Sequence, residues 1–210
     1  MKVGLAIFAA ACSLLTGCVT QPAKKDMSAF YAAAPRSILV VPTINRSLDV
    51  DAPSYVLAAL PIPIAEKGYY VFPVNTTKYV LEQEGFYEGE QIHQQPTESL
   101  AKLFGSDAVL YVAIKQWDAQ FAFITTTVTV DFEYRLVSKD GTEIWKEEKK
   151  MQYQPQNNSG GGLIGMVISA AVARAAPNYM PLTQQANQQV FVLGPNPLPN
   201  GPYRPMDPAK

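Results

Sequence analysis

The sequence predicts an α/β protein whose mixed sheet begins with a βαβ unit and ends in a long antiparallel hairpin, with helices packed on the sheet. Two short apolar runs, 37–41 and 69–74, flank a segment with helical spacing, which favours a parallel pair of strands. Residues 121–138 instead alternate between apolar and polar side chains, which is the period of a half-buried antiparallel strand. We therefore expect parallel pairing first and a meander afterwards.

The strands of the first half are short and continuously apolar. The run at 37–41 is rich in β-branched residues and ends at Pro42, as expected of a strand buried on both faces. A right-handed crossover should join it to the second strand at 69–74. The run at 107–114 is the most hydrophobic and is predicted to be the central strand.

Helices are predicted where apolar residues recur at helical spacing and a glycine closes the segment. These segments are 52–60 with a further turn up to Gly68, 75–84 before Gly85, and 97–104 before Gly105. Pro61 and Pro63 interrupt the first of them, so we expect it to break there.

The second half begins with the predicted hairpin. One face of the outgoing strand, 121–138, is apolar and contains Ala122, Ile124, Thr126, Val128, Val130, Phe132, Tyr134 and Leu136. Asp140 and Gly141 are typical hairpin-turn residues, and 142–154 is the predicted return strand.

A polar, glycine-rich connector at 154–162 precedes two predicted helices, 163–176 and 178–191. The last sixteen residues, 195–210, contain six prolines. Such a segment cannot join a helix or an inner strand, so we expect it to be disordered or to lie as polyproline II.

The first eighteen residues have the pattern of a bacterial lipoprotein signal peptide. Lys2 precedes an apolar run that is too short for a transmembrane helix, and Leu15-Thr16-Gly17-Cys18 fits a lipobox. We expect cleavage after Gly17 and lipidation of Cys18, with palmitate among the acyl chains. The predicted organisation is a signal peptide at 1–17, a lipidated tether at 18–34, a periplasmic domain at 35–193 and a proline-rich tail at 194–210.

Composition excludes several classes of function. The net charge is −1, so no long-range field favours nucleic acid. Cys12 lies within the signal peptide and Cys18 is assigned to lipid, which leaves no cysteine for a disulfide or a zinc site. His93 is the single histidine and has no nucleophile-elbow motif nearby. We predict no catalytic residue, no metal, no cofactor and no enzymatic activity.

A row of small residues begins just before the predicted helix at 163–176 and continues along it. Because they are four apart, they share one helix face and permit close approach of another element. They are Gly161, Gly165, Ser169 and Ala173. Packing on the sheet, contact with another subunit and insertion into a membrane are all open readings of this face.

Three segments resemble a family of proteobacterial lipoproteins of unassigned function that includes a neisserial surface antigen found by genome screening. They are 36–47, 59–63 and 66–74, and the resemblance extends from about residue 35 to residue 191. More distantly, the order of elements is similar to that of the periplasmic domain of the curli-secretion lipoprotein CsgG, the amino-terminal domain of TolB and the lipoprotein activator of a peptidoglycan synthase. This resemblance implies an α/β domain that binds other envelope proteins and often self-associates, and it implies no catalytic residues.

The sequence thus predicts an outer-membrane lipoprotein, anchored by its lipid and facing the periplasm. It would be a non-catalytic interaction or assembly module of an envelope or secretion complex. Its partners would be envelope lipoproteins, secretion components or further copies of itself. The alternatives are a component of an oligomeric outer-membrane pore and an activator of a peptidoglycan-synthesising enzyme. The predicted hairpin is a candidate pore element, but its return strand has charges on both faces, which disfavours contact with lipid.

Overall fold

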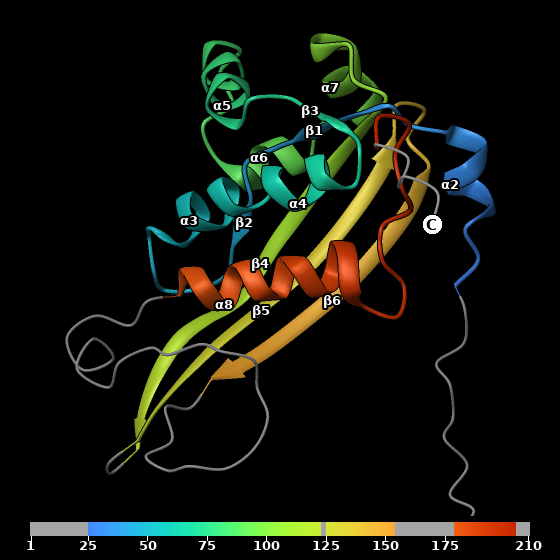
Figure 1. The fold of residues 1–210 in the computed structure, drawn as a ribbon. Helices are drawn as coiled ribbons and strands as arrows, with labels where there is room; N and C mark the ends of the chain where they lie inside the picture. Colours follow the sequence, from blue (N-terminus) through green and yellow to red (C-terminus); the bar gives the residue numbers. More distant parts are fainter. Residues whose placement is uncertain (1–24, 123–124, 154–178, 205–210) are drawn as a thin grey trace, which may run out of the picture.

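A computed structural model describes residues 25–122, 125–153 and 179–204, which form a mixed six-stranded sheet with helices on both faces (Figure 1). The strands are β1 Ser37–Val40, β2 Ile44–Asn45, β3 Tyr70–Val71, β4 Ala108–Ala122, β5 Thr125–Ser138 and β6 Glu143–Tyr153. The helices are α2 Ser28–Ala33, α3 Ala52–Ala59, α4 Pro61–Glu66, α5 Val74–Gln83, α6 Gly89–His93, α7 Thr97–Phe104 and α8 Met180–Gln188, the last continued by the π-helical turn Gln189–Leu193.

The sheet has the predicted mixed topology, with the strand order β3-β1-β4-β5-β6. β1 pairs in parallel with β3 and with β4, whereas β4, β5 and β6 form an antiparallel meander. The βαβ start, the parallel first pair and the central position of the third predicted strand are therefore confirmed. β2 was not predicted; it follows β1 and pairs in parallel with β4.

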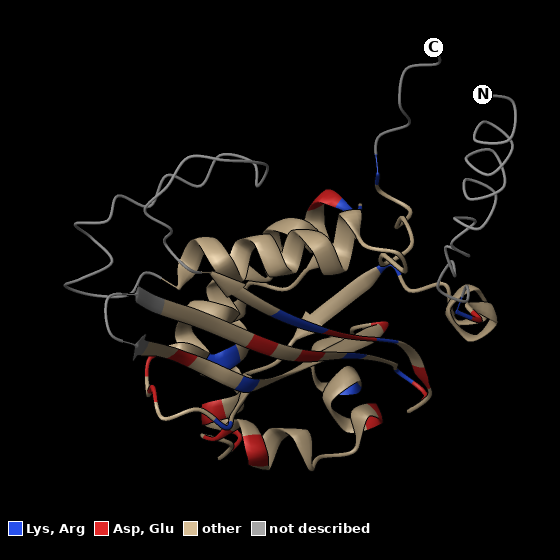
Figure 2. Ribbon diagram, turned by 90° about the horizontal axis from the view of Figure 1, so that it is seen from below, with Lys and Arg blue, Asp and Glu red and all other residues tan. Residues whose placement is uncertain are grey.

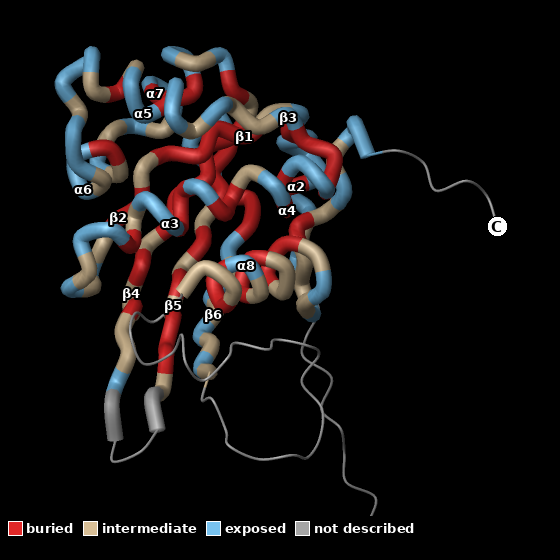
Figure 3. The backbone as a smooth tube through the Cα atoms, turned by 60° about the vertical axis from the view of Figure 1, so that its left-hand side comes forward, coloured by how far each residue is buried: buried red, intermediate tan, exposed pale blue. Residues whose placement is uncertain are grey.

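Both faces of β1 are buried, as its continuous apolar run predicts. Ile38 and Val40 belong to the larger core cluster, which also contains residues of α3, α4 and α8. Leu39 and Val41 belong to a second cluster, under α5, α6 and α7. β4 and β5 run through the buried interior of the domain (Figure 3). In the middle of β5, Phe132 and Tyr134 are fully buried, whereas Asp131, Glu133 and Arg135 on the other face are only partly buried.

Several elements differ from the sequence prediction. β3 is shorter than predicted because Pro73 precedes the first turn of α5, which starts at Val74. The strand predicted at 107–114 continues to Ala122, past an irregularity between Ile114 and Gln116, and a second hairpin then joins it to β5. Consequently 121–122 end one strand and β5 begins at Thr125. The connector at 154–162 and the helix at 163–176 lie outside the described residues.

The short helix α6 is not among the helices predicted from the sequence. Its start is a capping box, in which the side chains of Glu88 and Gln91 each bond the other residue's backbone N–H. Gly89 is required for close approach, since a Cβ there would collide with the carbonyl of Thr43.

The proline-rich tail is part of the domain as far as Arg204. Leu198 is 1% exposed and belongs to the larger core cluster. The proline N positions cannot donate hydrogen bonds, but Asn196 and Pro199 accept them through their carbonyls, from Trp145 Nε1 at 3.3 Å and Tyr69 Oη at 2.8 Å. The domain therefore extends to residue 204 rather than ending at 193.

The N-terminal boundary shifts as well. Residues 28–33 were assigned to the tether, but they form α2, whose Phe30 is 3% exposed and packs into the larger cluster. The packed domain thus begins within the predicted tether, close to the tail in space (Figure 1).

Candidate functional site

The face of β4, β5 and β6 opposite α3 and α8 carries rows of charged residues (Figure 2). α5, α6 and α7 cover one end of this face, around Val109, Tyr111 and Val137. Because Val130, Phe132 and Tyr134 point into the core, the residues between them point to the opposite face. The charged residues of this face, called the charged sheet face below, are Lys115, Asp131, Glu133, Arg135, Lys146, Glu148 and Lys150.

Ion pairs connect the three strands across this face. Lys115 Nζ lies 2.7 Å from Glu148 Oε2 and 3.7 Å from Asp131 Oδ1, so one lysine on β4 reaches carboxylates of β5 and of β6 beyond it. Lys146 Nζ lies 2.6 Å from Glu133 Oε1. The hydrogen bond with Glu148 raises the pKa of Lys115, and the hydrogen bond from Lys146 lowers the pKa of Glu133.

The irregularity in β4 explains the reach of Lys115. Ile114 pairs with Phe132 and Gln116 with Asp131, so Lys115 is an extra residue opposite no partner on β5. An inserted residue of this kind re-aims side chains locally. Both Ile114 and Phe132 remain fully buried, so the bulge adds a lysine to the outer face without shifting the core.

β6 is an edge strand of the sheet, and its outward-facing charged residues belong to the charged sheet face. Within the described residues it pairs with β5 alone. Its first half is covered by the N-terminal segment, because Lys25 Nζ donates to the carbonyl of Lys146 at 2.5 Å and to Glu147 Oε1 at 2.6 Å. An edge strand offers unpaired N–H and C=O groups to a strand from another protein.

On the side of the sheet that α3 and α8 cover, three aromatic rings are stacked, and one of them, Tyr55, is 47% exposed. Trp117 lies between Tyr55 and Tyr179, with centroids 6.2 and 4.7 Å away. Trp117 Nε1 donates to Asp49 Oδ2 at 3.2 Å, in a loop whose Leu48 and Val50 are fully or largely exposed.

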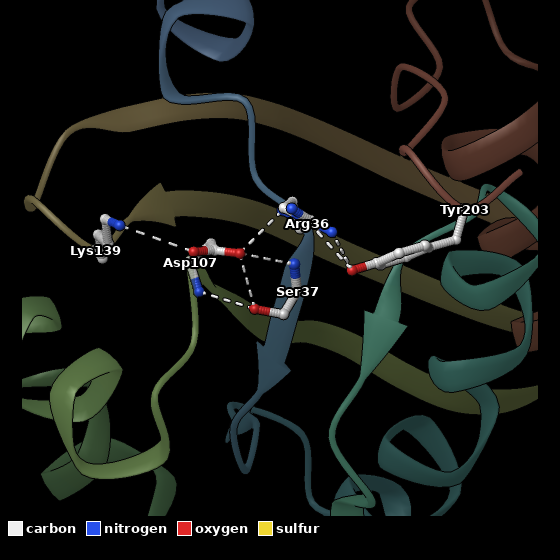
Figure 4. Close-up of polar contacts among 5 residues, drawn as sticks. All are labelled: Arg36, Ser37, Asp107, Lys139 and Tyr203. Atoms are coloured by element: carbon white, nitrogen blue, oxygen red, sulfur yellow. Dashed lines mark hydrogen bonds and ion pairs between the residues drawn. The ribbon is translucent and has the colours of Figure 1, made fainter.

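A polar cluster around Asp107 joins four segments at one end of the sheet (Figure 4). Asp107 Oδ2 accepts hydrogen bonds from the backbone N–H groups of Arg36 and Ser37 at 3.1 and 3.2 Å. The Arg36 guanidinium in turn donates to Tyr203 Oη at 3.0 and 3.2 Å, and Lys139 Nζ lies 3.8 Å from Asp107 Oδ1. The cluster therefore fastens β1, β4, the β5–β6 turn and the tail together.

His93 lies in a packed site. Its Nε2 is 3.0 Å from the carbonyl of Pro42, and since a carbonyl can only accept, Nε2 carries the proton. Its ring meets Tyr111 edge-to-face at 4.9 Å, and burial lowers the pKa of His93 to about 4. The imidazole is thus neutral at pH 7 and occupied by a structural hydrogen bond. No group of three potential metal-ligating side chains occurs in the described part of the chain.

The predicted site residues lie outside the described residues. This applies to the cleavage site at Gly17, the lipidation site at Cys18 and the small-residue face of Gly161, Gly165, Ser169 and Ala173. They stay predictions. Sequence reasoning did not find the charged sheet face as a unit, although the alternation at 125–135 placed its β5 residues on one face. Among the described residues, no helix is long and apolar enough to span a membrane.

Comparisons with known proteins agree with this fold. The family model described as "Putative lipoprotein GNA1162-like" matches residues 25–195. A lipoprotein-family member of Neisseria meningitidis serogroup B is 37% identical over 169 residues, which cover 80% of this chain and 78% of the relative. The crystal structure of lipoprotein GNA1162 from Neisseria meningitidis superposes with a TM-score of 0.57 at 37% identity, covering 67% of this chain and 97% of that chain. The chain therefore belongs to the GNA1162-like family of lipoproteins.

Proposed function

We propose that this protein is an outer-membrane lipoprotein whose periplasmic domain is a non-catalytic module for interaction or assembly within an envelope complex. Lipid on Cys18 would anchor the chain. Membership of a lipoprotein family supports the anchor, and the lipobox supports the residue. Val19 follows the cysteine where an aspartate would favour retention in the inner membrane, which supports the outer membrane as destination.

One observation carries the proposed role: the charged sheet face lies open beside an edge strand. Its ion pairs hold the lysines and carboxylates in fixed positions, so a partner with complementary rows of charge would meet a pre-ordered surface. The adjacent edge of β6 adds backbone groups that a partner strand can pair with. In contrast, the single histidine is held in a structural contact.

Site-specific photocrosslinking in living cells tests the interaction surface. A photoreactive amino acid replaces Lys150, which is exposed on the charged sheet face, or Tyr79, which is 61% exposed on α5. We expect a discrete crosslink to an envelope protein from position 150 and none from position 79. Equal crosslinking from both positions, or none from 150, would contradict the use of this face.

The crosslinked species also identifies the type of assembly. Recovery of another envelope lipoprotein or a secretion component supports an accessory module. Recovery of a peptidoglycan synthase would identify the module as an activator. Recovery of only further copies of this chain would replace the proposal with a self-assembling scaffold or pore.

The anchor is tested separately with radiolabelled palmitate. We expect incorporation into the wild type and into Cys12→Ala, and none into Cys18→Ala, because only Cys18 follows the lipobox residues. Membrane fractionation of the labelled protein then reports the destination. Label that persists in Cys18→Ala would show that the anchor is elsewhere.

A further inference from the structure

A groove of about 660 Å³ lies between the N-terminal segment and the tail. Lys25, which precedes α2, and Tyr31 within α2 line one side of it. Lys67 lines it from the end of α4, and Asn196 and Asn200 line it from the tail. Two lysines and two amides thus face one groove, and no acidic residue is among the described residues that line it.

Lys67 is the unusual member of this set. Only 6% of the residue is exposed, yet no ion pair or hydrogen bond of its ammonium is found among the described residues. Its backbone is fully used, since its N–H donates to Pro63 and Ile64 and its carbonyl accepts from Gly201 at 2.7 Å. Glu66, the neighbouring carboxylate, accepts a hydrogen bond from Gln188 instead.

The ammonium of Lys67 still reaches open space. It is not one of the enclosed, unpartnered side-chain atoms of the described chain, and the residue lines the groove. Burial and the nearby Arg204 both lower the pKa of Lys67, so its positive charge is held there at a cost. An anion in the groove would remove that cost.

The amides can add hydrogen-bond donors. Arg204 Nη1 donates to Asn200 Oδ1 at 2.6 Å, and the Lys25 N–H points to Asn196 Oδ1 at 3.5 Å. With both oxygens engaged, the two amide NH₂ groups remain as donors. Lys25 is paired with Glu147, whereas no ion pair of Lys67 or of the nearby Arg204 is found among the described residues.

We propose that this groove is a binding site for a phosphate group, with Lys67 as its central cation and the tail amides as donors. Two sources of phosphate fit: a phospholipid headgroup and a soluble phosphate compound. The headgroup source rests on the proposed lipid anchor, because Lys25 is seven positions after Cys18 and seven extended residues span at most about 25 Å. The site itself does not depend on the anchor.

Thermal unfolding of the full mature protein in a neutral detergent tests the site. The variants are Lys67→Met, which keeps an apolar stem of similar length, and Lys102→Met on the exposed face of α7 as the control. Inorganic phosphate is compared with chloride at equal ionic strength. We expect phosphate to raise the midpoint of the wild type and of Lys102→Met by about 3–5 °C at ten times its Kd.

Lys67→Met should differ from these two proteins in two respects. It should unfold at a higher temperature than the wild type in chloride, because an unpaired charge is gone, and it should not respond to phosphate. An equal response of Lys67→Met and wild type, or no response of either, would overturn the proposal. This readout requires no membrane, so its failure is distinguishable from failure of the anchor.

Acetylation of lysines, followed by mass spectrometry, identifies the source. The lipidated protein is placed in nanodiscs of phosphatidylcholine alone or with phosphatidylglycerol, with or without inorganic phosphate. Several-fold slower labelling of Lys67, but not of Lys102, in phosphatidylglycerol identifies a headgroup ligand. Protection by inorganic phosphate alone identifies a soluble ligand. Unchanged labelling of Lys67 under all conditions would overturn the site.

Discussion

At the scale of single residues, Gly68 has two separate functions. It ends α4 in the left-handed region, with φ +88°, as the C-cap pattern predicts. A Cβ at this position would also collide with the backbone of Arg204, because the tail crosses directly over it. The first function could be predicted from the sequence, whereas the second depends on a segment more than 130 positions later.

Gly68→Ala therefore should destabilise the protein more than a left-handed glycine alone would. Gly85 is the matched control, since its φ is +89° and nothing lies within 4 Å of a Cβ there. We expect Gly85→Ala to lower the free energy of unfolding by about 1 kcal/mol, and Gly68→Ala by about 3 kcal/mol or more, as the tail is displaced. Urea unfolding measures both, and equal losses would contradict the packing of the tail on Gly68.

At the scale of elements, the tail is held in place by one apolar anchor and several hydrogen bonds. Leu198 is 1% exposed, whereas Leu193, five positions earlier, is 74% exposed. The composition of this segment led to the prediction of a tail outside the domain, because six prolines exclude regular structure. Proline content does not exclude packing, since carbonyl groups remain free to accept bonds from Trp145 and Tyr69.

Leu198→Ala tests whether the tail contributes to the core. We expect a loss of about 2–4 kcal/mol in the free energy of unfolding, from the lost burial and the cavity left behind. Leu193→Ala removes the same atoms from an exposed position and should change stability by less than about 0.5 kcal/mol. Chemical denaturation of both variants is the measurement, and a small effect of Leu198→Ala would mean that the tail is dispensable.

The elements that the sequence predicted well are those with a strong local signal. The run at 37–41, the Gly105-terminated helix and the alternation along β5 all have patterns that tertiary contacts reinforce. The charged sheet face needed more than local pattern. Lys115 joins it only through a bulge, and the register that brings Lys115 to Glu148 spans three strands. The contact between Lys115 and Glu148, which are 33 positions apart, cannot be recognised from the local sequence pattern around either residue.

At the scale of the whole molecule, folding keeps the single histidine neutral. The unfolded chain titrates His93 near its ordinary pKa of 6.5, and the folded protein does so at about 4. Between these values the unfolded state binds a proton that the folded state does not. Stability is therefore complete above pH 6.5 and decreases as the pH falls towards 4.

We expect this single group to remove about 2 kcal/mol between pH 7 and pH 4.5, allowing for partial exposure of the ring. His93→Gln keeps a donor for the carbonyl of Pro42 but cannot titrate, so its stability should decrease less over the same range. Urea midpoints measured at half-unit pH intervals provide the test. Parallel curves for the two proteins would assign the acid sensitivity to other groups.

The placement of α2 also determines the distance between the N-terminal segment and the far end of the sheet. α2 packs at the end of the sheet where β6 begins, and the β4–β5 hairpin extends to the opposite end (Figure 1). β5 alone has fourteen residues, which corresponds to about 45 Å in an extended strand. In the lipid-anchored protein that we propose, the chain would be tethered beside α2, and the sheet would place the far end of β5 about 45 Å from that point.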